Sequence, residues 1–455
     1  MAETIAAVAT PLATGGISVI RISGDHALSV ADRVFLPSSH RALEKMSGYT
    51  CTLGQVVTDK GERVDQAIAT VFRAPKSYTG EDVVELSCHG GLLVTQYVLR
   101  AVFSAGARPA QPGEFTKRAF LNGKMGLTEA EAVMDIVGAQ GEAAARQAQA
   151  ALNGALHHSI LAIRGELLHA SAQLSAWVDY PDEDIPELEV DGLSKILTVA
   201  ENELSRLIDR FDAGRILREG VDTVIVGRPN VGKSTLMNLL AGSEKSIVTP
   251  VAGTTRDIVE ESVRLGDVLL RLADTAGIRP TEDSVEKIGV DRARARMESA
   301  GLVLAVFDAS EALSEEDLLL IDSLPITRSI AVINKSDLPK KIDELYVSSK
   351  FTRFVYISAG EGSGTEALSA QIYDLLSLSG LSTEEGMLST ERQFNAALRA
   401  QEALALALQD VSRGMTLDAV NVSLDDAIGA LLSLTGERVT EAVVDEVFSS
   451  FCVGK

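Results

Sequence analysis

The chain contains 455 residues and carries a formal net charge of −22, because 64 Asp and Glu side chains outnumber 42 Lys and Arg side chains. This length predicts about three domains. So acidic a chain is poorly suited to hold a nucleic acid unaided, because phosphate binding needs Lys and Arg. If the substrate is a nucleic acid, we expect a partner to supply the basic surface. Solubility is the alternative explanation of the charge.

The cysteines and the hydropathy exclude several protein classes. Cys51, Cys88 and Cys452 form no Cys-x-x-Cys pair, so we expect neither a disulfide framework nor a zinc site. The first basic residue is Arg21, and no apolar run approaches the ~18 residues that span a membrane. We therefore expect a cytoplasmic protein without a signal peptide or membrane segment. From its chemistry alone, Cys452 is expected to be buried or incidental.

The first 118 residues are typical of an α/β or α+β domain. Apolar and β-branched runs at 17–22, 66–72 and 83–87 predict strands, and glycine-containing turns punctuate the chain between them.

Long helices are predicted on both sides of a central segment. Residues 119–218 are rich in Ala, Gln, Glu and Leu, with interruptions near Pro181 and Pro186, and 379–455 again show helical apolar spacing. The simplest architecture inserts the segment 219–378 into one helical domain, because insertions fall where exposed chain ends lie close together. Two separate helical bundles are the alternative. The predicted fold class is α/β plus all-α.

Residues 227–235 match the phosphate-binding pattern Gly-x-x-x-x-Gly-Lys-[Ser/Thr]. Glycines let backbone N–H groups approach the phosphates, Lys233 reaches the terminal phosphates, and the Ser234 hydroxyl binds Mg²⁺. The flanks agree, because 223–226 predict a buried strand and 236–240 predict a helix. The stretch therefore predicts a nucleotide phosphate site.

A second motif predicts which base is bound. Asn334, Lys335 and Asp337 follow an apolar run, as expected at a strand end. The Asp337 carboxylate can accept from the N1–H and 2-amino groups of guanine, whereas adenine would leave it unpaired. Ser358 and Ala359 suggest a weaker base-side loop, for which a plain strand-end turn is an equal alternative.

The remaining motifs predict contacts to the metal and the γ-phosphate. Asp274 follows another strand-like run and can hold the Mg²⁺ shell, Gly277 can offer its N–H to the γ-phosphate, and Thr255 can complete the Mg²⁺ shell. Four such elements in order define a P-loop GTPase domain of the Ras type, here 219–378.

One position departs from the Ras pattern. Ile278 stands where Ras-like enzymes place a glutamine that orients the attacking water. Glu282, Asp283 and Glu286 follow it, and spacing does not choose among them. Arg256 is a candidate arginine finger, but a solvated loop arginine is the simpler interpretation.

Short motifs outside this domain complete the pattern. They are residues 20–24 (Ile-Arg-Ile-Ser-Gly), 77–82 (Ser-Tyr-Thr-Gly-Glu-Asp), Glu85, 89–91, 112–115, 118–122, Lys124 and the terminal 451–455 (Phe-Cys-Val-Gly-Lys). Together with the G-domain motifs, this set resembles the tRNA modification GTPase family called MnmE or TrmE, over essentially the whole chain.

The resemblance implies a function and several partners. It implies a homodimer whose N-terminal domain binds a 5,10-methylene- or 5-formyl-tetrahydrofolate, and a helical domain split by the G domain. With the FAD-dependent MnmG, in a heterotetramer or larger complex, such proteins add an aminomethyl or carboxymethylaminomethyl group to C5 of the wobble uridine of certain tRNAs, which bind mainly through the partner. By motif, Arg21, Glu85, Lys124 and Lys455 would contact the folate, and Cys452 would be needed for modification.

The resemblance also implies a different hydrolysis scheme. K⁺ would bind where an arginine finger acts, held by Asn230, Thr249, Val251 and Thr254, and Glu286 would be the catalytic residue that orients water. The full expected nucleotide site comprises Asn230, Val231, Gly232, Lys233, Ser234, Thr235, Thr249, Pro250, Val251, Ala252, Gly253, Thr254, Thr255, Asp274, Thr275, Ala276, Gly277, Asn334, Lys335, Asp337, Ser358 and Ala359.

A ribosome-assembly GTPase of the Era or Der type is the alternative function. Such a protein binds RNA directly and should show a basic face. Residues 379–455 instead hold 12 acidic and 5 basic side chains, which favours the first interpretation.

Overall fold

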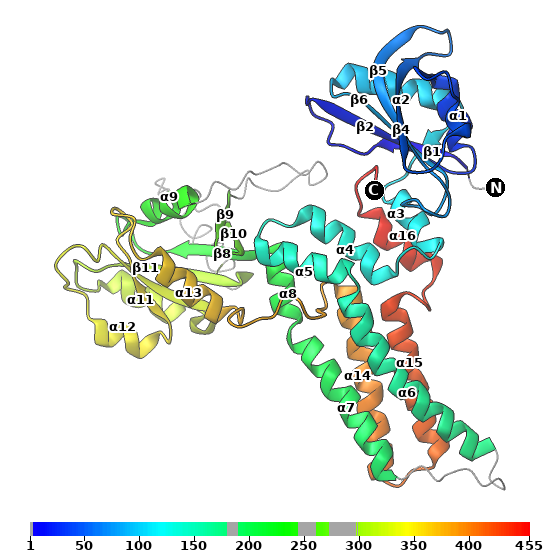
Figure 1. Ribbon diagram of the computed structural model, residues 1–455. Coiled ribbons are helices and arrows are strands. Elements are labelled where there is room, and N and C mark those ends of the chain that lie inside the picture. Colours follow the sequence, from blue (N-terminus) through cyan, green and yellow to red (C-terminus); the bar gives the residue numbers. More distant parts are fainter. Residues whose placement is uncertain (1–2, 180–189, 244–260, 273–296, 298) are drawn as a thin grey trace, which may run out of the picture. The chain divides into compact units, whose positions relative to one another are not determined.

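A computed structural model describes residues 3–179, 190–243, 261–272, 297 and 299–455 (Figure 1). Two compact units can be distinguished by their internal contacts. The first contains residues 1–134, 152–197 and 402–455, and the second contains residues 135–151 and 198–401.

The first unit contains a seven-stranded sheet in the order β3-β4-β5-β6-β2-β1-β7. Most neighbours are antiparallel, and only β1 and β7 pair in parallel. The strands are β1 (Ile5–Val8), β2 (Ile17–Ser23), β3 (Phe35–Pro37), β4 (Thr50–Val57), β5 (Arg63–Phe72), β6 (Val83–His89) and β7 (Arg108–Pro109). Alternate residues of β2 are buried, as expected for a sheet packed on one face.

Helices cover that buried face. Residues of α1 (Ala27–Val34) and α2 (Leu92–Ser104) share one hydrophobic core with β2, β5 and β6. The opposite face carries exposed apolar side chains, including Ile17, Leu53 and Ile68. A short 3-10 helix, η1 (Leu43–Lys45), and helix α3 (Glu114–Leu121) complete this part.

The helical region is built from both sides of the nucleotide-binding segment. Its helices are α4 (Leu127–Gly138), α5 (Glu142–Leu152), α6 (Ala155–Asp179), α7 (Val190–Asp209), α8 (Phe211–Glu219), α14 (Glu391–Ser412), α15 (Leu417–Thr435) and α16 (Glu441–Ser449).

Helices from before and after the inserted segment pack together. Asn421 of α15 donates to Ser175 of α6 at 3.1 Å, and Gln401 of α14 donates to Ser205 of α7 at 2.7 Å. The predicted insertion is therefore confirmed, and the alternative of two separate bundles is wrong.

The second unit contains a six-stranded sheet in the order β13-β12-β11-β8-β10-β9, parallel except for β9. Its elements are β8 (Val221–Val226), α9 (Lys233–Ser243), β9 (Glu261–Leu265), β10 (Val268–Leu272), β11 (Leu302–Asp308), α11 (Glu315–Ser323), η3 (Ile326–Arg328), β12 (Ser329–Asn334), α12 (Glu344–Lys350), β13 (Phe354–Tyr356) and α13 (Thr365–Leu375).

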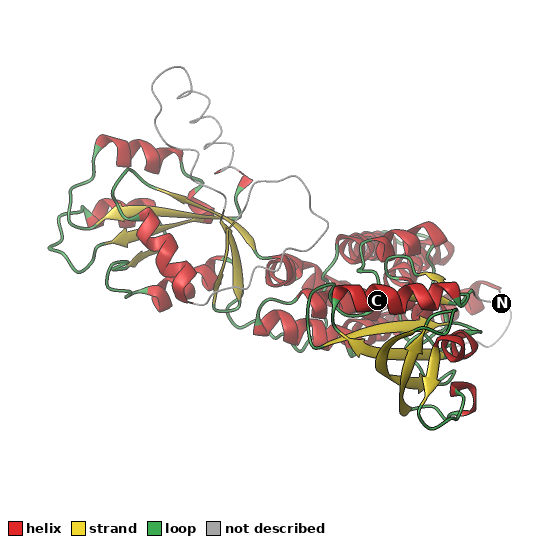
Figure 2. Ribbon diagram, turned by 90° about the horizontal axis from the view of Figure 1, so that it is seen from above, coloured by secondary structure: helices red, strands yellow, loops and turns green. Residues whose placement is uncertain are grey.

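Helices lie on both faces of this mostly parallel sheet (Figure 2). One core joins the sheet to α9 and α13, and another joins it to α11 and α12. Every residue of β11 and β12 is consequently buried, which explains why the sequence shows continuous apolar runs there instead of alternation.

The elements predicted from the sequence are confirmed within the described residues. The expected interruptions at Pro181 and Pro186 lie outside them, and the domain limits at 118, 218 and 378 stay predictions. No helix in the described part of the chain is both long enough and apolar enough to cross a membrane.

Leu304→Ala tests the central strand. Leu304 on β11 is 0% exposed, so its truncation should lower the free energy of unfolding by about 2–5 kcal/mol, through lost apolar burial and the cavity left behind. Denaturant unfolding of the full chain measures this change. Leu319→Ala is the matched control, because Leu319 of α11 is 71% exposed and should change stability by less than about 0.5 kcal/mol. Equal effects of the two changes would contradict the assignment of β11 to the core.

Candidate functional site

The phosphate-binding loop connects the end of β8 to the start of α9. Gly232 has φ +101°, and a Cβ there would stand 2.2 Å from Asn334 Nδ2, so only glycine fits. Asn230 has φ +66°, a left-handed conformation that asparagine tolerates better than most residues. The loop therefore has the backbone shape that the glycine spacing predicted.

Lys233 and the helix behind it supply positive charge at this loop. The Lys233 ammonium donates to the carbonyls of Gly227 and Arg228 at 2.7 and 2.8 Å, and burial lowers its pKa. Ser234 and Thr235 are exposed in the first turn of α9. A helix start with free N–H groups attracts phosphate, and an exposed hydroxyl there can bind Mg²⁺.

A buried asparagine joins the loops at the carboxyl edge of the sheet. Asn334 is 2% exposed. Its amide nitrogen donates to the Val231 carbonyl at 2.8 Å, and its amide oxygen accepts from the Ala359 N–H at 3.0 Å. Ser358 donates to the Asp337 carboxylate at 2.5 Å. The structure thus brings together the phosphate loop, the Asn-Lys-x-Asp motif and the 358–359 loop.

Two acidic side chains that pair with basic residues of this site were not predicted from the sequence. Asp308, at the end of β11, pairs with Lys335 at 2.5 Å. Burial would raise the pKa of Asp308, but hydrogen bonds from Lys335 and Ser310 outweigh it and lower the pKa. Asp308 directly follows an apolar run, so the strand-end rule that located Asn334 could have located it. Arg228 pairs with Asp317 at 3.2 Å, and no local signal announces that contact.

The other predicted nucleotide-site residues lie outside the described residues. They are Thr249, Pro250, Val251, Ala252, Gly253, Thr254, Thr255, Asp274, Thr275, Ala276, Gly277 and Glu286, together with Arg256, Ile278, Glu282 and Asp283. Among the described residues, no cluster of three or more His, Cys, Asp or Glu side chains could hold a metal ion.

A second group of predicted residues meets on the face of the first sheet opposite α1 and α2. Arg21 and Glu85 are direct partners on β2 and β6, and Arg21 Nε lies 2.8 Å from Glu85 Oε1. The guanidinium also packs over the rings of Tyr78 and Phe115, with centroids at 5.2 and 5.6 Å. Arg21 is therefore held in place by a carboxylate and by two aromatic faces.

The C-terminal segment reaches the same place. Arg21 Nη1 donates to the Gly454 carbonyl at 3.4 Å, and the Phe115 N–H donates to the Lys455 carbonyl at 3.1 Å. Gly454 has φ +104°, and a Cβ there would lie 2.3 Å from the Val8 carbonyl oxygen. Lys124 donates to the Pro75 carbonyl at 3.0 Å, on the loop that leads to Tyr78. Arg21, Glu85 and the C-terminal segment, far apart in sequence, thus meet in one region, and Lys124 contacts the loop that leads to Tyr78.

The cysteines differ in exposure. Cys452 is exposed, so of the two expectations, a buried or an incidental thiol, the buried one is wrong. The backbone of the C-terminal segment is held in place and leaves this side chain outside. Cys88 is buried, and this burial raises the pKa of its thiol to about 11. Of these two thiols, Cys452 is the one available to a reactant.

A buried charge cluster supports the segment beside this site. Glu114 of α3 accepts from Arg108 at 2.6 Å and from Arg118 at 2.9 Å. Arg118 also pairs with Glu81 at 3.0 Å. Burial alone would raise the pKa of Glu114, but hydrogen bonds from Arg108, the Gln111 N–H and Arg118 lower it to about 2.

Two family models match the chain. A model described as MnmE helical domain matches residues 127–452, and one described as GTP-binding protein TrmE N-terminus matches residues 4–124.

Full-length relatives agree with these matches. Proteins called tRNA modification GTPase MnmE are 39% identical in Carboxydothermus hydrogenoformans and 38% in Alkaliphilus oremlandii, covering 100% of this chain and 100% and 99% of the relatives. The relative of that name in Latilactobacillus sakei is 40% identical, covering 100% of this chain and 98% of its own.

Glu114→Gln tests the buried charge cluster. The folded pKa of Glu114 lies at about 2, below its ordinary 4.5, so its stabilising contribution is full above the ordinary value and is lost as pH falls through the folded pKa. The variant should unfold at a lower temperature near pH 7 and lose less of its remaining stability between about pH 5 and pH 2. Thermal unfolding at a series of pH values measures both effects. Glu62→Gln, at an exposed glutamate, is the control and should follow the unmodified chain. A pH dependence unchanged by Glu114→Gln would contradict the pairing.

Proposed function

The chain belongs to the MnmE family of tRNA modification GTPases, and we propose that it couples GTP hydrolysis to modification of C5 of the wobble uridine in certain tRNAs. The group added is aminomethyl or carboxymethylaminomethyl, and an FAD-dependent partner, MnmG, takes part in the reaction. The observation that carries the proposal is the buried Asn334 amide, which connects a phosphate loop, a guanine-reading motif and a third loop in one site.

In this proposal GTP binds along the carboxyl edge of the second sheet. Lys233 and the first turn of α9 meet the phosphates, Ser234 and Thr255 ligate Mg²⁺, and Asp337 reads guanine. Ser358 supports this role of Asp337, because its hydroxyl donates to the carboxylate at 2.5 Å and so orients it. A carboxylate on this edge favours guanine, which offers two N–H donors, over adenine.

The second part of the proposal is a one-carbon folate on the first sheet. Glu85 can accept from pterin N–H groups, and Arg21, Lys124 and Lys455 supply cations for a folate carboxylate tail. The contacts of Arg21 with Glu85 and Gly454 support this assignment. When bound, a methylene- or formyl-tetrahydrofolate supplies one carbon. The role of this chain is to hold it near the exposed Cys452.

The open sheet face also supports a homodimer. Ile17, Leu53 and Ile68 are 68%, 48% and 45% exposed there, on the face that carries Arg21. A second copy would cover these apolar side chains. We further propose that MnmG joins the dimer in a heterotetramer or larger complex in the cytoplasm, and that tRNA binds mainly through MnmG, because this chain is strongly acidic.

Hydrolysis is proposed to use K⁺ and Glu286 in place of a glutamine and an arginine finger. Asn230, Thr249, Val251 and Thr254 are the proposed K⁺ ligands. Asn230 lies in the phosphate-binding loop, where it is exposed and has a left-handed backbone. Its side chain is therefore accessible to a cation beside the phosphates, which supports its proposed role as a K⁺ ligand. A cation there neutralises charge that develops between the β- and γ-phosphates.

Loss of the gene should remove the modified wobble uridine from the affected tRNAs, as measured by mass analysis of tRNA nucleosides. A gene carrying Arg21→Ala should fail to restore it, because the folate tail loses a cation, while purified Arg21→Ala protein should hydrolyse GTP normally. Arg63→Ala, at an exposed arginine of the same sheet, should restore the nucleoside. The Era or Der alternative would be favoured by two results together. The wobble uridine would be modified normally without the gene, and the protein would co-purify with ribosomal subunits and not with a flavoprotein.

GTP hydrolysis should be faster in KCl than in NaCl at equal ionic strength. Glu286→Ala should lower the turnover rate in KCl by ~10²-fold or more, as expected when the residue that positions water is lost, with little change in GTP affinity. Glu282→Ala, which removes a neighbouring acid, is the control and should keep most of the rate. Phosphate release and nucleotide titration measure the two quantities. Equal rates in the two salts would exclude the K⁺ site.

A further inference from the structure

A β-hairpin connects the two loops that are proposed to sense the γ-phosphate. Its strands are β9 and β10, and by sequence it lies between Thr255 and Asp274. Its turn consists of Gly266 and Asp267. Whatever holds this turn therefore fixes a point between the two loops along the chain.

The Asp267 carboxylate holds the turn against the start of helix α5. Its Oδ1 accepts from the Ala143 N–H at 3.0 Å, and its Oδ2 lies 3.9 Å from Arg146 Nη2. A Cβ on Gly141 would lie 2.9 Å from the Asp267 carbonyl oxygen, so the two backbones approach closely. Asp267 therefore caps α5 from outside the helix, satisfying an N–H that has no partner within it.

The other side of the turn is held by α13. The Asp267 N–H donates to the Tyr373 hydroxyl oxygen at 2.6 Å. Burial raises the pKa of Tyr373, so this phenol stays neutral at physiological pH. The turn is thus fixed by its carboxylate to α5 and by its backbone to α13.

Helix α5 packs on the nucleotide-binding core although it precedes it in the chain. Ala143 shares a hydrophobic core with Leu265, Val268 and Leu270 of the hairpin. This core also includes Leu217 of α8, the helix that leads into β8. If the hairpin shifts, the first turn of α5 must therefore shift with it, or it loses both its core contact and its capping hydrogen bond.

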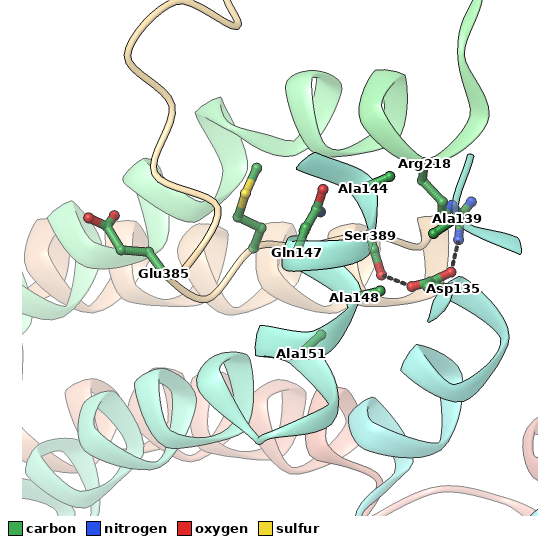
Figure 3. Close-up of a pocket in the computed structure, with 10 residues that line it drawn as sticks. Asp135, Ala139, Ala144, Gln147, Ala148, Ala151, Arg218, Glu385 and Ser389 are labelled. Carbon is green, nitrogen blue, oxygen red and sulfur yellow. Dashed lines mark hydrogen bonds and ion pairs between the residues drawn. The ribbon is translucent and has the colours of Figure 1, made fainter. Parts of the chain in front are cut away.

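The segment that carries α5 also contacts the entry and the exit of the inserted domain. Asp135, at the end of α4, accepts from Ser389 at 3.1 Å and pairs with Arg218 at 3.7 Å. Figure 3 shows these side chains together beside Ala144, Gln147 and Ala148 of α5. Arg218 lies just before β8, and Ser389 lies just before α14. Residues 135–151 thus contact the hairpin and the two points, near Arg218 and Ser389, where the chain enters and leaves the inserted domain. We call these two points the chain crossings.

We propose that Asp267 is a positioning residue that couples the phosphate end of the nucleotide site to helix α5. A change of nucleotide state that shifts β9 or β10 then alters the cap of α5, and the segment 135–151 transmits it to the chain crossings. The inference rests on the proposed function in one respect, namely that the site binds GTP.

Hydrogen exchange of the full-length protein tests this coupling. The backbone amides of residues 142–148 are followed with and without a non-hydrolysable GTP analogue. In the unmodified chain, the analogue should change their exchange rate by at least ~5-fold, the lower end of typical coupling between sites. Asp267→Ala should abolish that change with GTP affinity little altered. Asp267→Asn should restore part of it, because its amide oxygen can still accept from Ala143 N–H.

Asp222→Ala is the matched control. It removes an ion pair of 2.8 Å between Asp222 and Arg271 of the same hairpin, which does not involve α5, and it should keep the full response. Two results would overturn the inference but leave the proposed nucleotide site intact. One is a response that persists in Asp267→Ala. The other is no response of residues 142–148 in the unmodified chain although the analogue protects amides of α9. If the analogue protects no amides near Lys233, both the inference and the proposed nucleotide site fail.

Discussion

The buried amide of Asn334 is the contact on which the nucleotide site depends. It satisfies the Val231 carbonyl and the Ala359 N–H, which lie on loops from different strands. Without it, buried backbone groups would be left unpaired, at a cost of about 1–3 kcal/mol each. The same amide nitrogen leaves no room for a side chain at position 232. The glycine of the phosphate motif is therefore explained by a residue about 100 positions later in the chain.

Both proposed sites use acidic and basic side chains in fixed pairs. Arg21 with Glu85, Arg228 with Asp317, and Lys335 with Asp308 each place a cation at a loop or sheet surface and hold it with a carboxylate. Such pairs add little net stability when exposed, but they restrict where a cation can lie. A chain with a large acidic excess can thus still present positioned cations at chosen points.

Because one domain is inserted into another, the chain passes between them at two points. The chain crosses into the nucleotide-binding segment after α8 and returns before α14, so these crossings are covalent routes between the sites. Residues 135–151 contact both crossings and the hairpin. Because the Ala143 N–H at the start of α5 donates to the Asp267 carboxylate, the first turn of α5 depends on that side chain. These contacts are the physical basis of the coupling that we propose for this segment.

The sequence alone determined the elements and the motifs, because both follow local rules. Apolar runs predicted β8 and β12, and the spacing of Gly, Lys and Ser predicted the phosphate loop. The family resemblance also pointed to Arg21, Glu85 and the C-terminal segment, which lie far apart in the chain. Only the tertiary structure decided that Arg21 faces Glu85, that Asp308 holds Lys335, and that Asp267 caps α5. Those pairs depend on strand register and helix docking, which arise from packing of the whole core and leave no periodic signal in the chain.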